Sequence, residues 1–372
     1  MDVCVDIQAA VAQRAGVGRY THRLVDHLLP LAGDDRIELF CFDFKRNGTP
    51  FDGRAAVRRV AWIPGRVVQR AWRSRTGPAF DRFAGTHDVV HFPNFFLPPL
   101  RRGKAVVTVH DVSFLRHPEF TEERNLAFLN AHIRHTVRNA DAVLTDSRFS
   151  AGEIRELLGV PPDRLHAVPL GIDSRFRAPP PDDAAAVRRR LGLARPYLLT
   201  VGTVEPRKNL PFMVEVFERL EDFDGELVVA GMRGWKDAPI LRRLRGGPRA
   251  ERVRYLDYVP DADLPALYAG AAVFLVTSRY EGFGFPPLEA MACGTPVVSS
   301  AGGSLPEVLG DAAAVVDAFD AERWAAEVRR ALADDAHRRA LTKRGKERAA
   351  SYRWSDTAAR TWEIYRQLGG AA

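Results

Sequence analysis

Short apolar runs alternate with amphipathic helical stretches along almost the whole chain. The apolar runs are rich in β-branched residues, and between them lie stretches such as 19–29, where Tyr20, Leu24 and Leu28 recur at helical spacing. This alternation is typical of βαβ units and parallel sheets. We expect strands at residues 3–7, 37–42, 88–92, 105–110, 141–146 and 166–171, and farther along at 197–204, 226–231, 253–259, 272–278, 296–302 and 312–317.

One proline-rich segment interrupts this alternation. Residues 173–186 contain three consecutive prolines followed by two aspartates, which break regular structure. Together with the length of 372 residues, the break predicts an α/β protein of two Rossmann-like, doubly wound domains facing a central cleft. We expect an N-terminal domain over 1–173, a linker over 174–190 and a C-terminal domain over 191–354, with a helix at about 355–372 packing back on the first domain.

The composition is that of a soluble globular protein, and the cysteines narrow its compartment. With 46% apolar and 27% charged residues, the chain has no apolar run long enough to span a membrane, and its acidic N-terminus does not resemble a signal peptide. Cys4, Cys41 and Cys293 are odd in number, lie in or beside apolar runs and lack metal-ligand spacing. Reduced thiols in a cytoplasmic protein fit this pattern better than a disulfide framework.

The net charge of +7 is unevenly distributed. Residues 58–77, the arginine-rich segment, hold six arginines, two tryptophans and no acid. Such a segment can lie on anionic lipid headgroups at the inner face of a membrane or receive a phosphorylated acceptor. A solvated arginine face with tryptophans packed beneath explains it equally well. Nucleic acid is not indicated as a partner, because no nucleic-acid-binding motif accompanies the charge.

Two loops after predicted strands of the first half carry candidate chemistry. Gly16 and Gly18 precede a helical stretch, whose N-terminus presents free N–H groups to an anion or a sugar. A loop that needs positive φ explains these glycines equally well. His110 and Asp111 come at the end of strand 105–110, where a histidine side chain reaches a ligand beyond the sheet. A histidine that only holds the loop is the alternative.

A pair of cations marks the first strand end of the second half. Arg207 and Lys208 immediately precede a helical stretch over 209–220. Two cations at a helix N-terminus are unfavourable, because the helix dipole there favours anions. An anionic ligand such as a diphosphate, bound between them, removes this conflict.

Two glutamates eight residues apart flank a glycine turn farther along. Glu281 and Glu289 lie on either side of Gly-Phe-Gly and a double proline, in apolar surroundings where an unpartnered carboxylate is costly. Prolines fit the first turn of a helix, so the backbone donors of 282–285 stay free for phosphate oxygens. A carboxylate at Glu289 can accept both hydroxyls of a ribose, and Glu281 would face the other end of the ligand.

These motifs resemble the retaining nucleotide-sugar glycosyltransferases of family 4, which have the GT-B fold. The resemblance covers nearly the whole chain and rests on EGFGFPPLE (281–289) followed by AMACGTPVV, on EPRKN (205–209), ADAVLTDSRFSAGEI (140–154), VPLGID (168–173) and AGVGRY (15–20). It implies an acceptor-binding N-terminal domain and a C-terminal domain that binds the nucleotide-sugar donor.

The same resemblance implies a role for each candidate residue. Glu289 would bind the ribose, Glu281 the donor sugar, and Arg207 with Lys208 the diphosphate, while the nucleobase would lie near Val259. The candidate catalytic residues are His110, Glu281 and Lys208; the donor-binding ones are Gly18, Arg207, Lys208, Gly282, Phe283, Gly284, Phe285 and Glu289; the acceptor-binding ones are Arg19 and Asp111; none is expected to bind a metal.

Two positions bear on the phosphate site and on metals. Thr203 stands where many relatives have a phosphate-binding arginine, so either Arg207 and Lys208 suffice or Arg233 compensates. The Asp261-Ala-Asp263 motif has the spacing of a metal site, but it precedes a helical stretch where aspartate is an ordinary N-cap, and we interpret it as a cap.

The segments EPRKN and EGFGFPPLEAMACGTP are similar to those of bacterial mannosyltransferases of polysaccharide assembly. This similarity implies a metal-independent transfer of a hexose, first mannose from GDP-mannose and second a hexose from a UDP-sugar, onto a glycan or lipid-diphosphate-linked glycan. No cofactor is implied, because the nucleotide sugar is a substrate. An epimerase acting on nucleotide sugars and a non-catalytic nucleotide-sugar-binding subunit are the alternatives. The first needs an acid and base on the sugar ring, and the second is expected to have lost Lys208 or Glu281; donor turnover separates all three.

Overall fold

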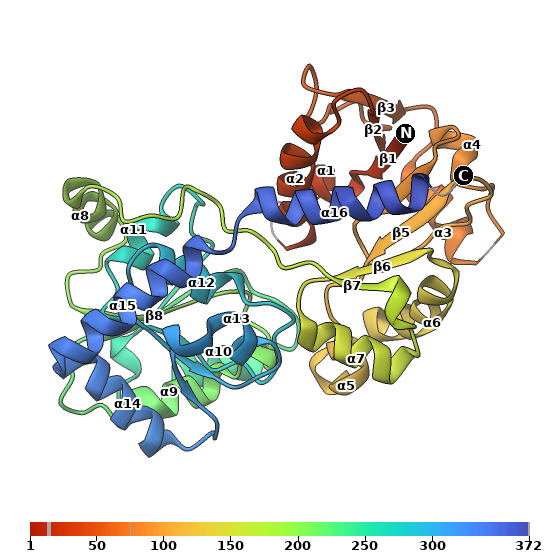
Figure 1. Ribbon diagram of the computed structural model, residues 1–372. Helices are drawn as coiled ribbons and strands as arrows, with labels where there is room; N and C mark the ends of the chain where they lie inside the picture. The colour runs from red at the N-terminus through yellow and green to blue at the C-terminus, as the bar shows by residue number, and fades with distance from the viewer. Residues whose placement is uncertain (13–15, 75, 371–372) are drawn as a thin grey trace. The chain divides into compact units, whose positions relative to one another are not determined.

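The computed structural model describes residues 1–12, 16–74 and 76–370 (Figure 1). The chain forms two compact units. The N-terminal unit comprises Met1–Leu115, Glu123–Gly171 and Trp354–Ala372, and the C-terminal unit comprises Arg116–Glu122 and Ile172–Arg353. Two segments therefore belong to a different unit from the residues beside them in the sequence: 116–122 to the C-terminal unit and the end of the chain from Trp354 to the N-terminal unit.

The N-terminal unit is built on a parallel sheet of seven strands. Their order in the sheet is β3-β2-β1-β4-β5-β6-β7, and Val3 of β1 lies opposite Ile37 of β2 and Val89 of β4. The six strands expected from the sequence are confirmed, whereas β3 was not expected, because this edge strand is largely exposed and carries two arginines. The strands are β1 (Asp2–Asp6), β2 (Arg36–Phe42), β3 (Ala56–Val60), β4 (Val89–Phe92), β5 (Lys104–Thr108), β6 (Ala142–Thr145) and β7 (Leu165–Ala167).

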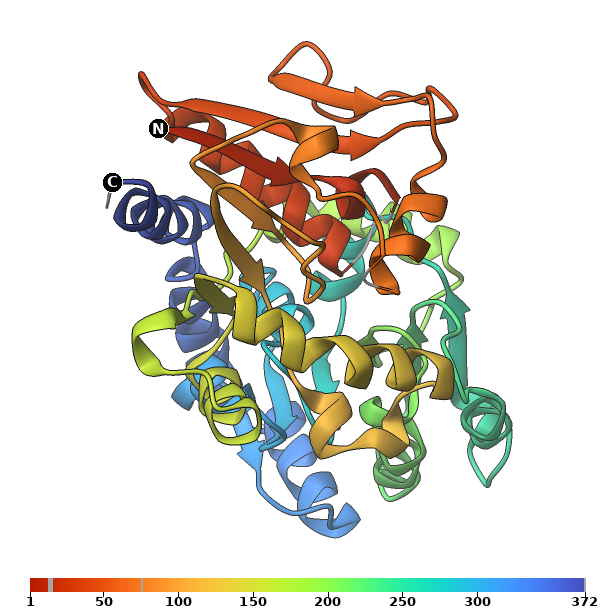
Figure 2. The same cartoon turned by 90° about the vertical axis from the view of Figure 1, so that its right-hand side faces the viewer.

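Helices cover both faces of this sheet (Figures 1 and 2). Successive strand residues point to opposite faces, so Val90 and Val107 enter the core formed with α3, α6 and α7, while His91 and Thr108 face α16 and α2. The helices are α1 (Gln8–Ala12), α2 (Val17–Leu28), η1 (Leu29–Leu31), α3 (Gly65–Arg73), α4 (Asp81–Ala84), α5 (Ser113–Arg116), α6 (Glu123–Asn139), α7 (Arg148–Leu158), η3 (Pro162–Arg164) and α16 (Trp354–Gly369).

The C-terminal helix α16 belongs to the N-terminal unit. It lies beside α2, where the ring of Trp354 packs near those of Tyr20 and His27. The helix that the sequence predicts at about 355–372 is thus observed from Trp354 to Gly369, while residues 371 and 372 lie outside the described part of the chain.

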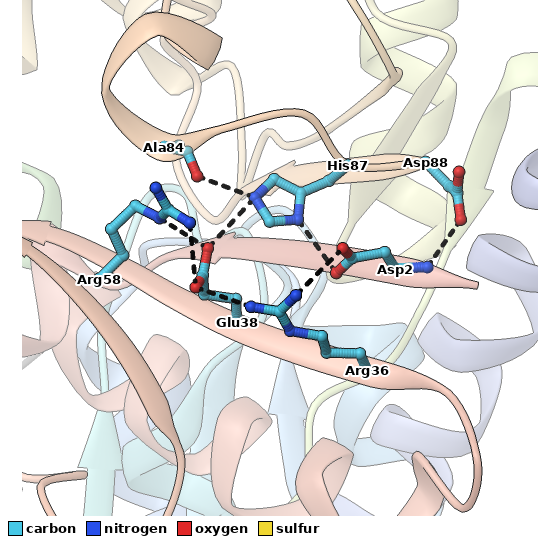
Figure 3. A network of polar contacts seen from close by, with 7 residues as sticks. All are labelled: Asp2, Arg36, Glu38, Arg58, Ala84, His87 and Asp88. Atoms are coloured by element: carbon cyan, nitrogen blue, oxygen red, sulfur yellow. Dashed lines mark hydrogen bonds and ion pairs between the residues drawn. The ribbon is translucent and has the colours of Figure 1, made fainter.

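A network of charged side chains lies where β1 and β4 begin (Figure 3). The buried His87 places one ring nitrogen 3.1 Å from Asp2 Oδ1 and the other 3.0 Å from the carbonyl of Ala84. The buried Glu38 accepts hydrogen bonds from Arg58 at 2.8 Å and Arg36 at 3.1 Å. These partners satisfy a carboxylate that would be costly to bury alone. Because the network is at the amino ends of the strands, we assign it to the structure of the sheet.

The C-terminal unit has a parallel sheet of six strands in the order β10-β9-β8-β11-β12-β13. All six strands expected from the sequence are confirmed: β8 (Tyr197–Val201), β9 (Glu226–Ala230), β10 (Val253–Asp257), β11 (Val273–Val276), β12 (Val297–Ser300) and β13 (Ala314–Val316). All six end before the expected segment does, and the residues that follow them belong to loops.

Helices also cover both faces of the second sheet. On one face α9, α10 and α14 pack against Leu198, Leu227 and Leu275. On the other, Tyr197 and Phe274 contact α11, and α12 packs against β11. The helices are η2 (Pro118–Phe120), α8 (Pro181–Arg190), η4 (Pro206–Lys208), α9 (Leu210–Glu218), α10 (Ala238–Leu244), η5 (Ala250–Arg252), α11 (Leu264–Ala269), α12 (Phe285–Ala292), α13 (Leu305–Leu309), η6 (Gly310–Ala312), α14 (Ala321–Ala333) and α15 (Asp335–Ala350).

The segment expected to be a linker, 174–190, ends in a helix. Pro181 begins α8, Asp182 and Asp183 occupy its first turn, and three arginines occupy its last turn. Proline suits the first helical position and this charge order suits the helix dipole, so the prolines mark a helix start. The helix packs on α11 within the C-terminal unit, and the stretch without helix or strand is confined to residues 168–180.

Across the described ranges, no helix combines the length and apolar character that crossing a bilayer requires.

Candidate active site

The strand order of the second sheet places two candidate loops side by side. The chain runs from β8 outward to β9 and β10, then returns to β11 on the other side of β8. In doubly wound sheets, ligands bind at such a reversal, beyond the carboxyl ends of the strands. The loop after β8 carries Arg207 and Lys208, and the loop after β11 carries Glu281. The sequence therefore folds so that these three side chains meet.

Glu281 is the centre of a charged cluster. Its Oε1 accepts hydrogen bonds from Lys208 Nζ at 2.7 Å and Ser278 Oγ at 2.5 Å, and its Oε2 accepts one from Arg207 Nη1 at 2.6 Å. Arg207 also donates to Glu205 Oε1 at 2.6 Å. Glu281 is 6% exposed and Glu205 is 2% exposed. Two cations and two carboxylates thus balance one another in a largely buried cluster.

The electrostatics of Glu281 follow from these contacts. Burial by itself would raise the pKa of the carboxyl, but the charges of Arg207 and Lys208 outweigh it and lower the pKa to about 2. Glu281 is therefore ionised throughout the neutral range. The sequence argument that an anionic ligand must relieve the two cations needs correction, because Glu281 and Glu205 already supply the opposite charges.

The loop after β12 holds Glu281 in place. Ser304 donates its backbone N–H to the carbonyl of Glu281 at 2.9 Å and its hydroxyl to the carbonyl of Phe283 at 3.1 Å. A Cβ added to Gly303, which has φ +67°, would lie 2.4 Å from the Glu281 carbonyl oxygen. A Cβ on Gly302 would lie 2.3 Å from the carbonyl oxygen of Ser278. Sequence reasoning missed this support, although Gly302 ends a predicted strand and Gly303 follows it.

The turn that follows Glu281 begins α12 as expected. Gly284 is the residue before the helix and has φ +102°, which favours glycine. Pro286 and Pro287 lie in the first turn, where their missing N–H groups leave no helical hydrogen bond unmade. The ring of Phe283 is buried against Phe285 and Tyr352. The phenylalanines of the turn therefore pack on the protein, while Gly282 is buried at the start of the same turn.

Glu289 lies on the buried side of α12. It is 2% exposed, and its Oε2 accepts a hydrogen bond from the hydroxyl of Tyr268 on α11 at 2.9 Å. Tyr268 is itself fully buried. The structure thus holds the Glu289 carboxylate in one orientation, and Tyr268 is a supporting residue that the sequence did not indicate.

In the N-terminal unit, His110 lies two residues beyond the end of β5 and pairs with Asp146. The His110 Nδ1 atom is 2.8 Å from Asp146 Oδ2, and the Tyr20 ring packs on the imidazole in a T-shaped pair with centroids 4.7 Å apart. Burial would lower the pKa of His110, but the charge of Asp146 reverses this effect and the pKa is raised. The Nε2 atom is buried and makes no hydrogen bond among the described residues.

The remaining candidates of this unit lie near the carboxyl ends of β1 and β5. Gly16, with φ +57°, is the residue before α2, and Gly18 and Arg19 are in its first turn, so these glycines do open a helix. Residues 13–15, which share this loop, lie outside the described part of the chain. The Asp111 carboxylate accepts the backbone N–H of Ser113 at 2.9 Å, at the start of α5.

A further acid ends β1, where the strand order of the first sheet reverses. Burial raises the pKa of Asp6 to about 6, and the backbone N–H of Gln8 partly opposes this effect. Sequence reasoning missed this group, although it lies near the end of a predicted strand.

Asp261 and Asp263, which have the spacing of a metal site, pair with arginines. Asp263 immediately precedes α11, but its side chain caps no backbone N–H and pairs with Arg190 of α8. Asp261 pairs with Arg175 at 3.2 Å. The prediction that an aspartate caps this helix is thus wrong in one respect: Asp263 occupies the N-cap position, but its side chain accepts no hydrogen bond from the helix. In residues 1–12, 16–74 and 76–370, no three histidine, cysteine or acidic side chains converge as metal ligands.

Arg233, which could compensate for the arginine missing at position 203, pairs with Asp237, the residue that precedes α10. Its Nε donates to Asp237 Oδ2 at 2.6 Å, and its side chain is 61% exposed. Arg207 and Lys208 are therefore the better-placed cations beside Glu281.

The arginine-rich segment forms β3, a turn and α3. Trp72 is buried, and its indole N–H donates to the carbonyl of Pro78 at 2.7 Å. Trp62, in contrast, is 73% exposed and stacks on Phe83. One tryptophan thus packs beneath the arginines as in a structural face, and the other lies on the surface. Arg75 lies outside the described residues.

Comparisons with known proteins fit this arrangement. The model of "Glycosyltransferase Family 4" matches residues 14–176, and that of "Glycosyl transferases group 1" matches residues 185–348. The chain is 38% identical over 284 residues to O-antigen chain mannosyltransferase B of Escherichia coli, which covers 75% of this chain and 74% of that protein. The chain belongs to the family 4 glycosyltransferases. The resemblance inferred from its motifs is confirmed.

Other similarities define the fold and the breadth of the family. This glycosyltransferase is 32% identical over 250 residues to the D-inositol 3-phosphate glycosyltransferase of Xylanimonas cellulosilytica, covering 62% of the chain but only 58% of that relative. The sucrose-phosphate synthase of Thermosynechococcus elongatus superposes with a TM-score of 0.75 at 22% identity, with both chains fully covered. Together with the two parallel sheets, this likeness identifies the GT-B fold.

Proposed function

We propose that this glycosyltransferase moves mannose from GDP-mannose to a glycan acceptor, with retention of the anomeric configuration and without a metal ion. The similarity to an O-antigen chain mannosyltransferase over three quarters of both chains carries the proposal. A UDP-hexose is the second candidate donor, because the family fold by itself does not determine the sugar or the base. The acceptor is a lipid-diphosphate-linked glycan of a surface polysaccharide.

Under this proposal, the Glu281 cluster forms the floor of the donor site. Glu281 holds the Lys208 ammonium and the Arg207 guanidinium in fixed positions before any ligand arrives. Fixed cations stabilise charge that develops on a leaving group without the cost of reorganisation. The two cations therefore neutralise the diphosphate, and Glu281 accepts a hydrogen bond from a hydroxyl of the donor sugar.

The remaining roles follow from the same positions. The backbone N–H groups of residues 282–285 face the diphosphate. Glu289, oriented by Tyr268, accepts hydrogen bonds from the ribose hydroxyls. His110, with Nε2 unpaired among the described residues, meets the sugar near its anomeric carbon. Gly18 lets the N-terminus of α2 approach the donor, and Arg19 with Asp111 contact the acceptor.

The bond changes are those of a front-face displacement. The bond between the anomeric carbon and the diphosphate oxygen breaks, and the acceptor hydroxyl oxygen bonds to the same carbon on the same face. The departing phosphate oxygen takes the acceptor proton. Negative charge accumulates on the diphosphate in the transition state, so cations aimed at it lower the barrier.

Incubation with GDP-mannose, UDP-glucose and other sugar nucleotides, with and without membrane-extracted lipid-linked glycans, tests this proposal. We expect GDP release to require GDP-mannose, to persist in EDTA, and to give an α-linked product by NMR. A β-linked product overturns retention, and turnover of a UDP-sugar alone overturns the choice of donor.

The arginine-rich segment motivates a proposal about the acceptor's location. Arg66, Arg70 and Val67 of α3 are exposed, and Trp62 lies exposed just before this helix. Arginines with an exposed tryptophan bind the headgroup region of anionic membranes, where a lipid-linked acceptor is found. We propose that this surface associates with the inner face of the cell membrane.

Vesicle flotation tests this association. We expect the wild type to float with vesicles containing anionic phosphatidylglycerol, and Arg66→Glu with Arg70→Glu to lose binding. Arg323→Glu with Arg339→Glu, which changes two exposed arginines of the C-terminal unit by the same charge, serves as the control. Equal flotation of all three proteins contradicts the proposal.

A further inference from the structure

A buried chain of hydrogen bonds joins the C-terminal helix to the surroundings of His110. The Tyr365 hydroxyl of α16 lies 2.5 Å from His91 Nδ1, and His91 Nε2 lies 2.8 Å from Thr108 Oγ1. Thr108 Oγ1 in turn lies 3.0 Å from the Tyr20 hydroxyl. These four side chains are at most 3% exposed, although they come from α16, β4, β5 and α2. A chain of polar groups this deep is costly unless every member is paired, and here each has a partner.

The end of the chain fixes a ring against the imidazole of His110. The rings of Tyr20 and His110 pack on each other at nearly a right angle, with an interplanar angle of 86°. Since the Tyr20 hydroxyl is held by Thr108, its ring cannot turn away without breaking a buried hydrogen bond. The position of the imidazole therefore depends on a residue of α16 that is 255 positions later in the sequence.

The opposite side of the imidazole is fixed by Asp146. This carboxylate ends β6, is 5% exposed and lies directly before the N-terminus of α7, whose dipole favours an anion there. It accepts the N–H of His110 Nδ1, so neutral His110 carries its proton on Nδ1 and its lone pair on Nε2. The Nε2 atom is buried and makes no hydrogen bond of regular geometry in the described part of the chain, while the backbone of Pro93 also favours the charged ring. A buried polar atom without a partner is rare and points to a ligand.

We propose that Asp146 and the chain from Tyr365 to Tyr20 are positioning elements that aim His110 Nε2 at the reacting sugar. The proposal rests on the role of His110 in the proposed function. It makes α16 a functional part of the N-terminal unit, because its Tyr365 orients a residue of the site.

The titratable neighbours of His110 support this geometry. Asp146 and Asp111 both raise the pKa of His110, whereas burial and, to a smaller extent, the charge of His110 lower the pKa of His91 to about 3. His91 is therefore neutral and links its two neighbours as one donor and one acceptor. Burial raises the pKa of Tyr20, so its hydroxyl keeps its proton. Of the two imidazoles, His110 is thus the one whose surroundings favour the charged form.

A double-mutant cycle separates positioning from general stabilisation. We expect Asp146→Asn to lower kcat for nucleotide release by about tenfold to a hundredfold with little change in KM for the donor. Tyr365→Phe should lower kcat by about threefold to tenfold, the loss of one neutral hydrogen bond. In a His110→Ala background, neither change should reduce kcat further. Tyr197→Phe, which removes a buried hydroxyl that donates to the Leu267 carbonyl, is the matched control and should leave kcat unchanged.

The pKa of His110, followed by histidine NMR, gives a readout that does not depend on turnover. Because the Asp146 charge raises this pKa, Asp146→Asn should lower it, and the acidic limb of the rate profile should move in the same direction. The proposal is overturned if Asp146→Asn and Tyr365→Phe lower kcat in the His110→Ala background by the same factors as in the wild type. It is also overturned if the pKa of His110 is unchanged in Asp146→Asn. If the wild type turns over no sugar nucleotide, the proposed function fails while the NMR result still decides the positioning.

Discussion

Removal of the Lys208 ammonium is the sharpest perturbation of the Glu281 cluster. In Lys208→Ala, Glu281 loses a hydrogen bond of 2.7 Å but keeps Arg207 at 2.6 Å and Ser278 at 2.5 Å. The carboxylate therefore stays ionised and partnered. A hydrogen bond to a charged group contributes about 1.5–3 kcal/mol to stability. This loss is smaller than the typical 5–15 kcal/mol of a folded protein, so we expect the variant to fold.

The effect of the same change on turnover should be much larger. Loss of one preorganised group that stabilises developing charge costs about a hundredfold to a thousandfold in kcat. Steady-state nucleotide release gives kcat, and a thermal unfolding scan gives stability. Lys104→Ala is the control, because Lys104 also pairs with a carboxylate, Asp141 at 3.1 Å, but is 51% exposed. A folded Lys208→Ala enzyme with nearly wild-type kcat would refute the role of this cation.

Three further outcomes follow from the structure. The pKa of Glu281 is lowered from 4.5 to about 2 on folding, so its ionisation contributes about 3 kcal/mol above pH 4.5, and this contribution is lost as the pH falls from 4.5 toward 2; in urea unfolding, the advantage of wild type over Glu281→Gln should shrink between pH 6 and pH 3, and a constant advantage would contradict the assignment. Gly303→Ala should destabilise the protein and reduce turnover, because its Cβ would lie 2.4 Å from the Glu281 carbonyl oxygen; Gly53→Ala, with φ +77° but no atom within 4 Å of the added Cβ, controls for backbone strain, and equal effects of the two changes would argue against the clash. Turnover should be the same with and without EDTA, and restoration of an EDTA-inhibited enzyme by Mg²⁺ would show that the fixed cations do not suffice.

The strands were predictable because parallel strands covered on both faces are continuous apolar runs. Only β3 escaped, since an edge strand needs apolar residues on fewer positions and Arg58 and Arg59 interrupt it. The prolines before Asp182 were interpreted only as a linker signal, although proline followed by acids also starts a helix, as it does at α8.

The residues of the Glu281 cluster were recognisable from the sequence, but their contacts were not. Strand ends and charge spacing identified Lys208 and Glu281, yet they are 73 positions apart, and no local pattern shows that one neutralises the other. For the same reason, the apolar environment of Glu289 was evident from the sequence, but its partner Tyr268 was not. Asp146, in contrast, is the last residue of a predicted strand, as His110 is of another. The two side chains could be expected to meet only once β5 and β6 are known to be adjacent in the sheet.

Thermal unfolding in EDTA, with GDP, UDP, ADP and their sugars as ligands, tests the central claim most directly, because a ligand that binds only the folded protein raises its unfolding temperature. The account predicts stabilisation by GDP and GDP-mannose, and a much smaller shift in Lys208→Ala. The absence of a shift with every nucleotide in a well-folded sample, or an undiminished shift in Lys208→Ala, would contradict the claim that the Glu281 cluster binds a nucleotide-sugar diphosphate.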